Sequence, residues 1–425
     1  MHRSAPAVTA LAVLGVLGLL AAGCGPGAAT NQVLRKASSS PSPSPEPGGS
    51  SSASVLPPAP TTPRTAPPAP ARPACTNARV VARWPLDRRA AQVLAVPALD
   101  FDTAGAMPEV ARGAGGVLFL GSAAPPRDLA HRLQALRAHA PRVPPLVMAD
   151  EEGGGVQRLL GLVAAIPWAR SMAATMSVAQ TRALARSTGR QMLAAGVTTD
   201  LAPVLDVDGR PGPSTSNADG ERSFSASPRV AASYGVAFMT GLRDAGVLPV
   251  VKHFPGLGGA QQNTDNGPAA TRPLSTLRSL DLVPFRAAIR AGAPAVMTSN
   301  ASVPGLTSLP ASLSRAVIGG LLRDELGFRG LVITDSLSAG AVTAVTSSLT
   351  DATVRALAAG ADLVLYGSTL TPADKSALQE SRTLATYQAL VAAVVAAVRA
   401  HRLPVQRLDA AVLDVLHAKR TDLCS

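Results

Sequence analysis

The sequence predicts an α/β protein whose single folded domain is a (β/α)8 barrel of the TIM type. From residue 75 onward, short apolar runs bounded by Gly, Pro or Asp alternate with amphipathic helical patterns. Nearly continuous apolar strands that alternate with helices indicate a parallel sheet covered by helices. Eight such units in about 350 residues match one barrel. A doubly wound open sheet is the alternative, but no Gly-rich dinucleotide fingerprint opens the first unit.

Each predicted strand is a short apolar run that stops at a turn residue or a polar residue. The predicted strands are residues 92–97, 115–120, 145–149, 199–205, 248–251, 295–299, 331–334 and 361–366. The clearest helical patterns between them are residues 127–140, 178–195, 228–245, 277–291 and 312–326. In a barrel this order brings the carboxyl ends of all the strands to one rim.

The first 74 residues are expected to lie outside the domain. Basic residues precede an apolar run at residues 5–20, and small residues then lead to Cys24. This pattern resembles a bacterial lipoprotein signal over residues 1–23, with a plain signal peptide as the alternative. Residues 24–74 are rich in Ser, Pro, Ala and Thr, which predicts a disordered tether. The domain then occupies residues 75–425.

Export has consequences for the location of the protein and for its cysteines. Lipid on Cys24 would anchor the protein to the outer side of the cell membrane, whereas a plain signal peptide would give a secreted protein. Cys75 and Cys424 bracket the domain in an oxidising compartment, so a disulfide between them is predicted, with two free thiols as the alternative. The net charge of +12 does not predict nucleic-acid binding, because no basic cluster is interleaved with aromatic residues.

Polar side chains follow several of the predicted strands. Because barrel enzymes carry their active sites at the carboxyl ends of the strands, these side chains are expected to form one site. Each alone is explained as well by a helix cap or a solvated loop, but five such strand ends favour function. The strand-end residues are Asp150, Asp206, Lys252 with His253, Asn300, and Asp335 with Ser336.

The motifs around these residues resemble the single-domain β-N-acetylglucosaminidases (β-hexosaminidases) of glycoside hydrolase family 3, in an actinobacterial-like lipoprotein form. The matching segments occur in family order within residues 92–366. They are residues 150–158, 201–206, 221–224, 252–256, 281–285, 325–328 and 332–338. The resemblance implies a retaining exo-glycoside hydrolase that removes terminal β-linked N-acetylglucosamine from peptidoglycan fragments or related glycans. It implies no cofactor and no metal.

The resemblance also assigns roles to individual positions. Asp335 matches the catalytic nucleophile, a carboxylate that attacks an anomeric carbon through a cationic transition state. Five further positions match residues that bind the sugar, where charged groups fix the hydroxyls and hence the ring orientation. These are Asp150, Arg158, Arg222, Lys252 and His253.

One segment departs from the family. The Asp-Ser-His triplet that carries the family's proton-shuttling His falls on residues 263–265, so Asp265 takes the place of that His. Leu257 and Asn300 stand at two other family His positions. We expect Asp265 to be the general acid/base, with a raised pKa. The alternatives are a β-glucosidase-like exo-hydrolase and a catalytically silent lipoprotein that binds wall glycan.

Overall fold

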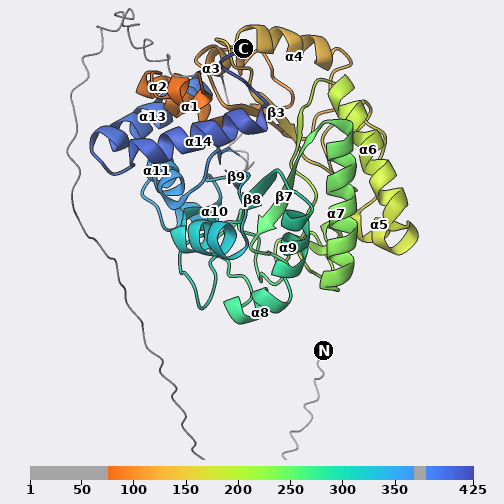
Figure 1. Cartoon of the computed structure of the whole chain (residues 1–425). Helices are drawn as coiled ribbons and strands as arrows, with labels where there is room; N and C mark the ends of the chain where they lie inside the picture. The colour runs from red at the N-terminus through yellow and green to blue at the C-terminus, as the bar shows by residue number, and fades with distance from the viewer. Residues whose placement is uncertain (1–74, 368–379) are drawn as a thin grey trace, which may run out of the picture. The chain divides into compact units, whose positions relative to one another are not determined.

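The computed structural model describes residues 75–367 and 380–425, and these form a nearly closed barrel of parallel strands (Figure 1). The strand order is β10-β1-β2-β3-β6-β7-β8-β9. The barrel closes where Ile333 pairs in parallel with Leu363 and the Thr334 amide donates to the Leu363 carbonyl at 3.0 Å. The predicted fold class is therefore confirmed. The barrel strands are β1 (Leu94–Leu99), β2 (Gly116–Leu120), β3 (Leu146–Ala149), β6 (Thr199–Asp200), β7 (Leu248–Phe254), β8 (Ala295–Thr298), β9 (Leu331–Thr334) and β10 (Val364–Leu365).

Helices cover the outside of the barrel (Figure 1). The α-helices are α1 (Asn77–Val81), α2 (Leu86–Gln92), α3 (Met107–Ala111), α4 (Leu129–Ala138), α5 (Ala169–Thr175), α6 (Val178–Ala194), α7 (Pro228–Ala245), α8 (Leu274–Ser279), α9 (Leu282–Arg290), α10 (Gly340–Thr343), α11 (Leu349–Ala359), α13 (Glu380–Arg399) and α14 (Val405–Ala418). Short 3-10 helices are η1 (Gly220–Arg222) and η2 (Ala311–Leu313), and η3 (Ala316–Glu325) is a π-helix. A small hairpin, β4 (Glu151–Gly153) with β5 (Val156–Gln157), follows β3.

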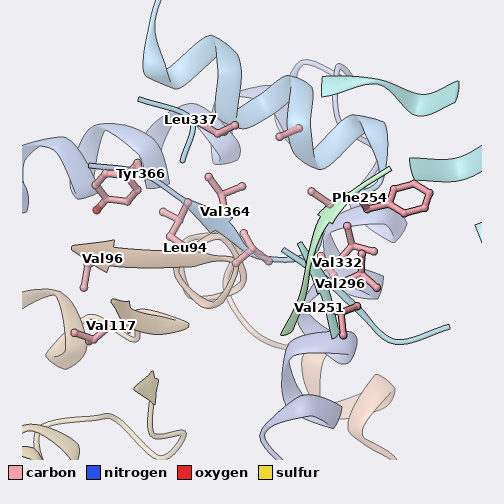
Figure 2. Close-up of a cluster of buried hydrophobic side chains, with 14 of the residues drawn as sticks. Leu94, Val96, Val117, Val251, Phe254, Val296, Val332, Leu337, Val364 and Tyr366 are labelled. Carbon is pink, nitrogen blue, oxygen red and sulfur yellow. The ribbon is translucent and has the colours of Figure 1, made fainter. Parts of the chain in front are cut away.

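Alternate side chains of the barrel strands enter two different apolar layers. Leu94 and Val96 of β1 belong to the layer between the strands and the helices, which Figure 2 shows in part. Ala95, between them, belongs to the cluster that fills the barrel interior. This alternation follows from the two-residue period of a strand. Val415 of α14 joins the interior cluster, so α14 packs against one end of the barrel.

The strands around the predicted site differ from the sequence-based bounds. β6 ends at Asp200 instead of residue 205, because Pro203 has no amide hydrogen for a ladder hydrogen bond. β7 continues past residue 251 to Phe254, so Lys252 and His253 lie within the strand and not in a loop. The Ser299 amide donates to the Phe254 carbonyl at 2.8 Å, which extends the pairing with β8.

Two predicted helices also differ from the observed ones. The pattern at residues 277–291 is divided into α8 and α9, and Pro284 in the first turn of α9 lacks the amide that would continue one helix. The pattern at residues 312–326 becomes η2 followed by η3, a wider π-helix with Gly319 and Gly320 at its centre. Glycines lower helix propensity, which is consistent with a departure from α geometry there.

The two ends of the domain are joined to each other. Cys75 and Cys424 form a disulfide, the pairing expected from the sequence. Beside it, the Asn77 side chain donates to the Thr421 carbonyl and accepts from the Leu423 amide, both at 2.8 Å. The predicted signal, Cys24 and the tether lie outside the described residues. Among residues 75–367 and 380–425, no helix is long and apolar enough to span a bilayer.

Candidate active site

A buried lysine joins two carboxylates at the carboxyl ends of β3 and β7. The Lys252 ammonium lies 2.6 Å from Asp150 Oδ1 and 2.6 Å from Glu152 Oε1, and its side chain is only 3% exposed. Asp150 and Glu152 are two positions apart in extended backbone, which places both side chains on one face. Burial alone would lower the pKa of Lys252, but Asp150 and Glu152 outweigh it and raise that pKa. Lys252 is therefore a fixed positive charge.

Arg222, at the end of η1, binds the same glutamate through two parallel hydrogen bonds. Its Nε and Nη2 donate to the two oxygens of Glu152, each at 2.8 Å. Such a fork is strong and fixes the guanidinium plane. Burial would raise the pKa of Glu152, but the charges of Arg222 and Lys252 outweigh it and lower that pKa. Glu152 thus stays ionised and aligns two cations at the rim.

Arg158, which follows β5, approaches the other side of Asp150. Its Nη1 donates to the Gly121 carbonyl at 3.1 Å, and its Nε lies 4.0 Å from Asp150 Oδ2. The structure therefore brings Asp150, Arg158, Arg222 and Lys252 together, as the sequence predicts. Asp150 keeps partial exposure, with 15% of its side chain accessible.

His253 points into this group with a defined tautomer. Its Nδ1 lies 2.7 Å from Asp206 Oδ2, and its Nε2 lies 3.5 Å from an Arg222 nitrogen. Burial, with the nearby charges of Arg222 and Lys252, lowers the pKa of His253 to about 4. The ring is therefore neutral near pH 7, and the hydrogen bond to Asp206 assigns the proton to Nδ1. The Lys252–His253 peptide bond is cis.

Asp335 follows β9 directly and faces the same rim. Its amide donates to the Thr298 carbonyl at 2.9 Å, and its Oδ1 accepts from the Ser336 amide at 2.7 Å. Burial raises the pKa of the Asp335 carboxyl, and the negative charge of Asp265 raises it further. The two carboxyl groups therefore lie close enough to affect each other's protonation.

The loop that carries Asp265 is held against the chain that follows β9. The Gly340 amide donates to the Asp265 carbonyl and the Ala341 amide to the Thr264 carbonyl, both at 3.0 Å. A Cβ on Gly340 would lie 2.9 Å from the Asp265 carbonyl oxygen, so this approach requires glycine. Asp265 as a whole residue is exposed. Burial of its carboxyl group nevertheless raises the pKa of Asp265, and the positive charge of Arg222 opposes that rise.

The two remaining family His positions support the local backbone. The Leu257 amide donates to Asp206 Oδ1 at 2.6 Å, while its side chain packs with Ala218, Ala260 and Ala301. Asn300 donates to the Ser336 carbonyl at 2.7 Å and accepts from Ser312 at 2.6 Å. Asn300 therefore fixes the backbone immediately after Asp335.

Sequence reasoning missed the roles of two acidic residues here. Glu152 lies two residues after Asp150 in the same motif. In extended backbone that spacing places both side chains on one face, which is the signal that could have identified Glu152. Asp219 is fully buried, and among the described residues neither of its oxygens meets a hydrogen-bond donor. No pattern in the sequence marks it.

Asp219, Asp206 and His253 also have the donor set of a metal site, with ligand-type atoms within 4.8 Å of one another. Two observations favour a proton over a cation there. Arg222 already brings a positive charge to His253, and Asp206 already accepts from the His253 ring. Burial, with the charge of Asp206, raises the pKa of Asp219 well above its usual range. With a proton on Asp219, Asp206 and Asp219 together carry one negative charge instead of two.

These groups have the composition of a glycosidase site. Ionised carboxylates and fixed cations lie at the carboxyl ends of the strands of a (β/α)8 barrel, together with a further pair of carboxyl groups, Asp335 and Asp265. The chain belongs to glycosyl hydrolase family 3, because the model of that family's N terminal domain matches residues 87–418. Beta-hexosaminidase LpqI of Mycobacterium tuberculosis is 40% identical over 285 residues, covering 65% of this chain and 68% of that protein.

Solved structures agree with this assignment. The structure of M. tuberculosis LpqI has a TM-score of 0.71 at 36% identity and covers 81% of this chain and 96% of that chain. The β-N-acetylhexosaminidase of Beutenbergia cavernae has a TM-score of 0.70 at 32% identity, with coverage of 80% and 100%. The chain therefore matches these two solved chains over nearly their whole length.

Proposed function

We propose that the protein is a retaining exo-β-N-acetylhexosaminidase that removes terminal β-linked N-acetylglucosamine from cell-wall fragments or related glycans. The observation that carries this proposal is the interacting carboxyl pair, Asp335 and Asp265, beside the charged group built on Lys252. Relatives and structural neighbours that bear the name hexosaminidase support the sugar specificity.

The charged residues around Lys252, namely Asp150, Arg158 and Arg222, bind the terminal sugar together with it. Asp150, held by Lys252, accepts hydrogen bonds from ring hydroxyls, and Arg158 donates to them from the opposite side. Arg222 and the neutral His253 complete the wall of the site. Because these charges are paired with one another before substrate arrives, little reorganisation is required on binding.

The reaction then takes two steps. Asp335 attacks the anomeric carbon while the glycosidic bond breaks, and the leaving oxygen takes the proton of Asp265. In the second step, the oxygen of a water molecule attacks the same carbon while that water gives a proton to Asp265. Asp335 then leaves as a free carboxylate. The raised pKa of Asp265 keeps a protonated fraction available for the first step.

Trapping of the covalent intermediate tests this assignment. A 5-fluoro glycosyl fluoride of N-acetylglucosamine forms the intermediate readily and slows its breakdown, so mass mapping should find the label on the peptide that contains Asp335. Asp335→Asn should take no label. Label on a different carboxylate would refute the assignment.

Two chromogenic substrates and a binding assay separate the alternatives. Release of nitrophenol from an aryl glucoside in preference to an aryl N-acetylglucosaminide would replace the proposed activity with that of a β-glucosidase. Sugar binding without turnover of either substrate would replace it with the function of a glycan-binding lipoprotein.

We further propose that the protein is exported and carries lipid on Cys24, which is supported by the signal-like run and the polar tether. Metabolic labelling with a palmitate analogue should tag the wild-type protein, and Cys24→Ala should not be tagged. Unlabelled wild-type protein in the culture medium would show that the signal is an ordinary one.

A further inference from the structure

A cavity of about 1400 Å³ lies at the end of the barrel opposite the candidate active site. Its wall includes the first residues of several strands, among them Leu146, Leu248 and Leu331, whereas the candidate site follows the carboxyl ends of the strands. The other wall is the end of α14 and residues 421–422, beside the disulfide. The two sites therefore do not share a residue.

The cavity lining has an excess of positive charge. Five cationic side chains line it, and none forms an ion pair with a carboxylate of the described residues. Two carboxylates also line it: Asp414 lies 3.6 Å from Arg323 outside the cavity, and Asp422 accepts from the Cys424 amide at 2.9 Å. The five cations are Arg137, Arg243, Arg329, Lys419 and Arg420.

All five cations lie at or beside the carboxyl ends of helices. Arg137 and Arg243 lie in the last turns of α4 and α7, where a cation stabilises the helix carboxyl end. Lys419 is the C-cap residue of α14, and Arg420 follows it. Arg329 donates to the Arg323 carbonyl in the last turn of η3 and to the Phe328 carbonyl, at 2.7 and 3.1 Å. The helix ends therefore explain where these cations stand, and what remains without explanation is that none of them has a carboxylate partner among the described residues.

Lys419 has a neutral hydrogen-bond partner and no acidic partner among the described residues. Its ammonium donates to the neutral Gln92 Oε1 at 3.0 Å, and that glutamine donates in turn to the Gly113 carbonyl at 2.8 Å. Burial lowers the pKa of Lys419 to about 7, with no acidic group opposing it. An anion in the cavity would favour the charged ammonium.

We propose that this cavity binds a phosphate-bearing ligand. Several cations around one cavity, with few carboxylates, suit a multiply charged oxyanion better than a single carboxylate. Apolar side chains such as Ile289, Phe328 and Leu413 line the rest of the cavity, so the ligand has an organic body attached to its phosphate. Either a soluble phosphate ester or the headgroup of an anionic lipid has this chemistry.

Binding measurements on the full chain test the proposal. Calorimetric titration with inorganic phosphate and with glucose 6-phosphate, and co-sedimentation with vesicles of phosphatidylglycerol and phosphatidylcholine in equal parts, separate a soluble ligand from a lipid. At least one probe should bind saturably. Lys419→Met and Arg329→Gln should each weaken that binding by about tenfold, the effect of one lost charged contact.

Arg229→Gln is the matched control, because it removes the same charge from an exposed residue of α7 that does not line the cavity. It should bind the probes like the wild type, and all three variants should hydrolyse a chromogenic substrate at the wild-type rate. Absence of saturable binding to every probe, or an equal loss in Arg229→Gln, would refute the proposal. Because hydrolysis is measured separately, this result is independent of the proposed function.

Discussion

Asp265 differs from a histidine in the charge of its base form. A histidine is neutral when it is ready to accept a proton, whereas a carboxylate is negative. An anionic acceptor that approaches the glycosyl-enzyme therefore meets repulsion from Asp265, which is stronger in a partly closed site than in water. The carboxyl pair favours water as the acceptor.

Asp265→Ala should retain turnover of aryl glycosides with good leaving groups, which need no proton, and lose far more activity on natural glycans. Added azide should partly restore activity to this variant, because a small anionic nucleophile needs no general base and no longer meets a charge. Added phosphate should hardly accelerate the wild type. Initial rates on both substrate types, with each anion, measure these effects. An Asp265→Ala enzyme that is unimpaired on both substrates would place the acid/base elsewhere.

The raised pKa values of Asp335 and Asp265 predict a bell-shaped dependence of kcat/KM on pH. Asp335 acts as a carboxylate, so activity falls as the pH falls through its pKa. Asp265 acts first as an acid, so activity falls as the pH rises through its pKa. Because the two groups interact, the apparent values belong to the pair. The acidic limb should lie above the ordinary aspartate pKa of about 3.9.

Rate profiles of the wild type and Asp265→Ala check this expectation. With a good leaving group, Asp265→Ala should lose the alkaline limb and keep the acidic one, because only the proton donor has gone. A wild-type acidic limb that stays at the ordinary aspartate pKa would contradict the raised pKa that burial gives the Asp335 carboxyl.

At the scale of single residues, the sequence identified the groups that lie at strand ends in recognisable motifs. Asp150, Lys252 and Asp335 are of this kind, and the structure places them at one rim. Asp219 was not identifiable, because its partner Asp206 is thirteen positions away and the contact depends on how the intervening loop folds. A spatial pair of buried carboxyl groups leaves no periodic pattern in the sequence.

At the scale of elements, the hairpin of β4 and β5 depends on a buried glutamate. Oε1 of Glu151 accepts from the Arg158 and Leu159 amides at 2.7 and 2.6 Å, and the residue is 0% exposed. Burial raises the pKa of Glu151 to about 7 from 4.5. The native state thus binds a proton that the unfolded chain releases, and the stability this provides is lost as the pH rises through about 7.

Glu151→Gln should remove the fall in stability that the wild type shows as the pH rises. Glutamine keeps an oxygen that accepts from both amides and resembles the protonated glutamate in shape and charge. The variant should gain free energy of unfolding relative to the wild type between about pH 5 and about pH 8, measured by denaturant titration. Glu221→Gln, at an exposed glutamate, should show no such gain. A difference between Glu151→Gln and wild type that does not change with pH would contradict the linkage.

Element existence followed from the sequence, and element bounds did not. All eight barrel strands lie where apolar runs predicted them, because burial between helices and barrel interior imposes that composition. The hairpin of β4 and β5 escaped prediction, since three glycines and two glutamates do not resemble a strand. Its pairing instead comes from the local contacts of Glu151.

At the scale of the whole molecule, stability and catalysis are expected to separate between the two ends of the barrel. The candidate site lies at the carboxyl ends of the strands, and the Cys75–Cys424 disulfide lies beside the opposite end, where Asn77 and Thr421 line the cavity. The disulfide spans 349 positions of the chain. In the chain-entropy model, so long a closure disfavours the unfolded state by on the order of 5 kcal/mol, although native disulfides commonly contribute about 2–5 kcal/mol.

A double variant, Cys75→Ser with Cys424→Ser, should therefore unfold at a lower Tm and keep the wild-type kcat/KM at temperatures where it remains folded. Loss of the disulfide raises the entropy of the unfolded chain and allows α1 to fray from the C-terminal tail. Neither effect reaches Asp335. Calorimetry and initial rates measure the two effects. Reduction with dithiothreitol should lower the wild-type Tm to that of the variant and leave the variant unchanged. A fall in kcat/KM without a fall in Tm would mean that the two ends of the barrel are coupled through its interior.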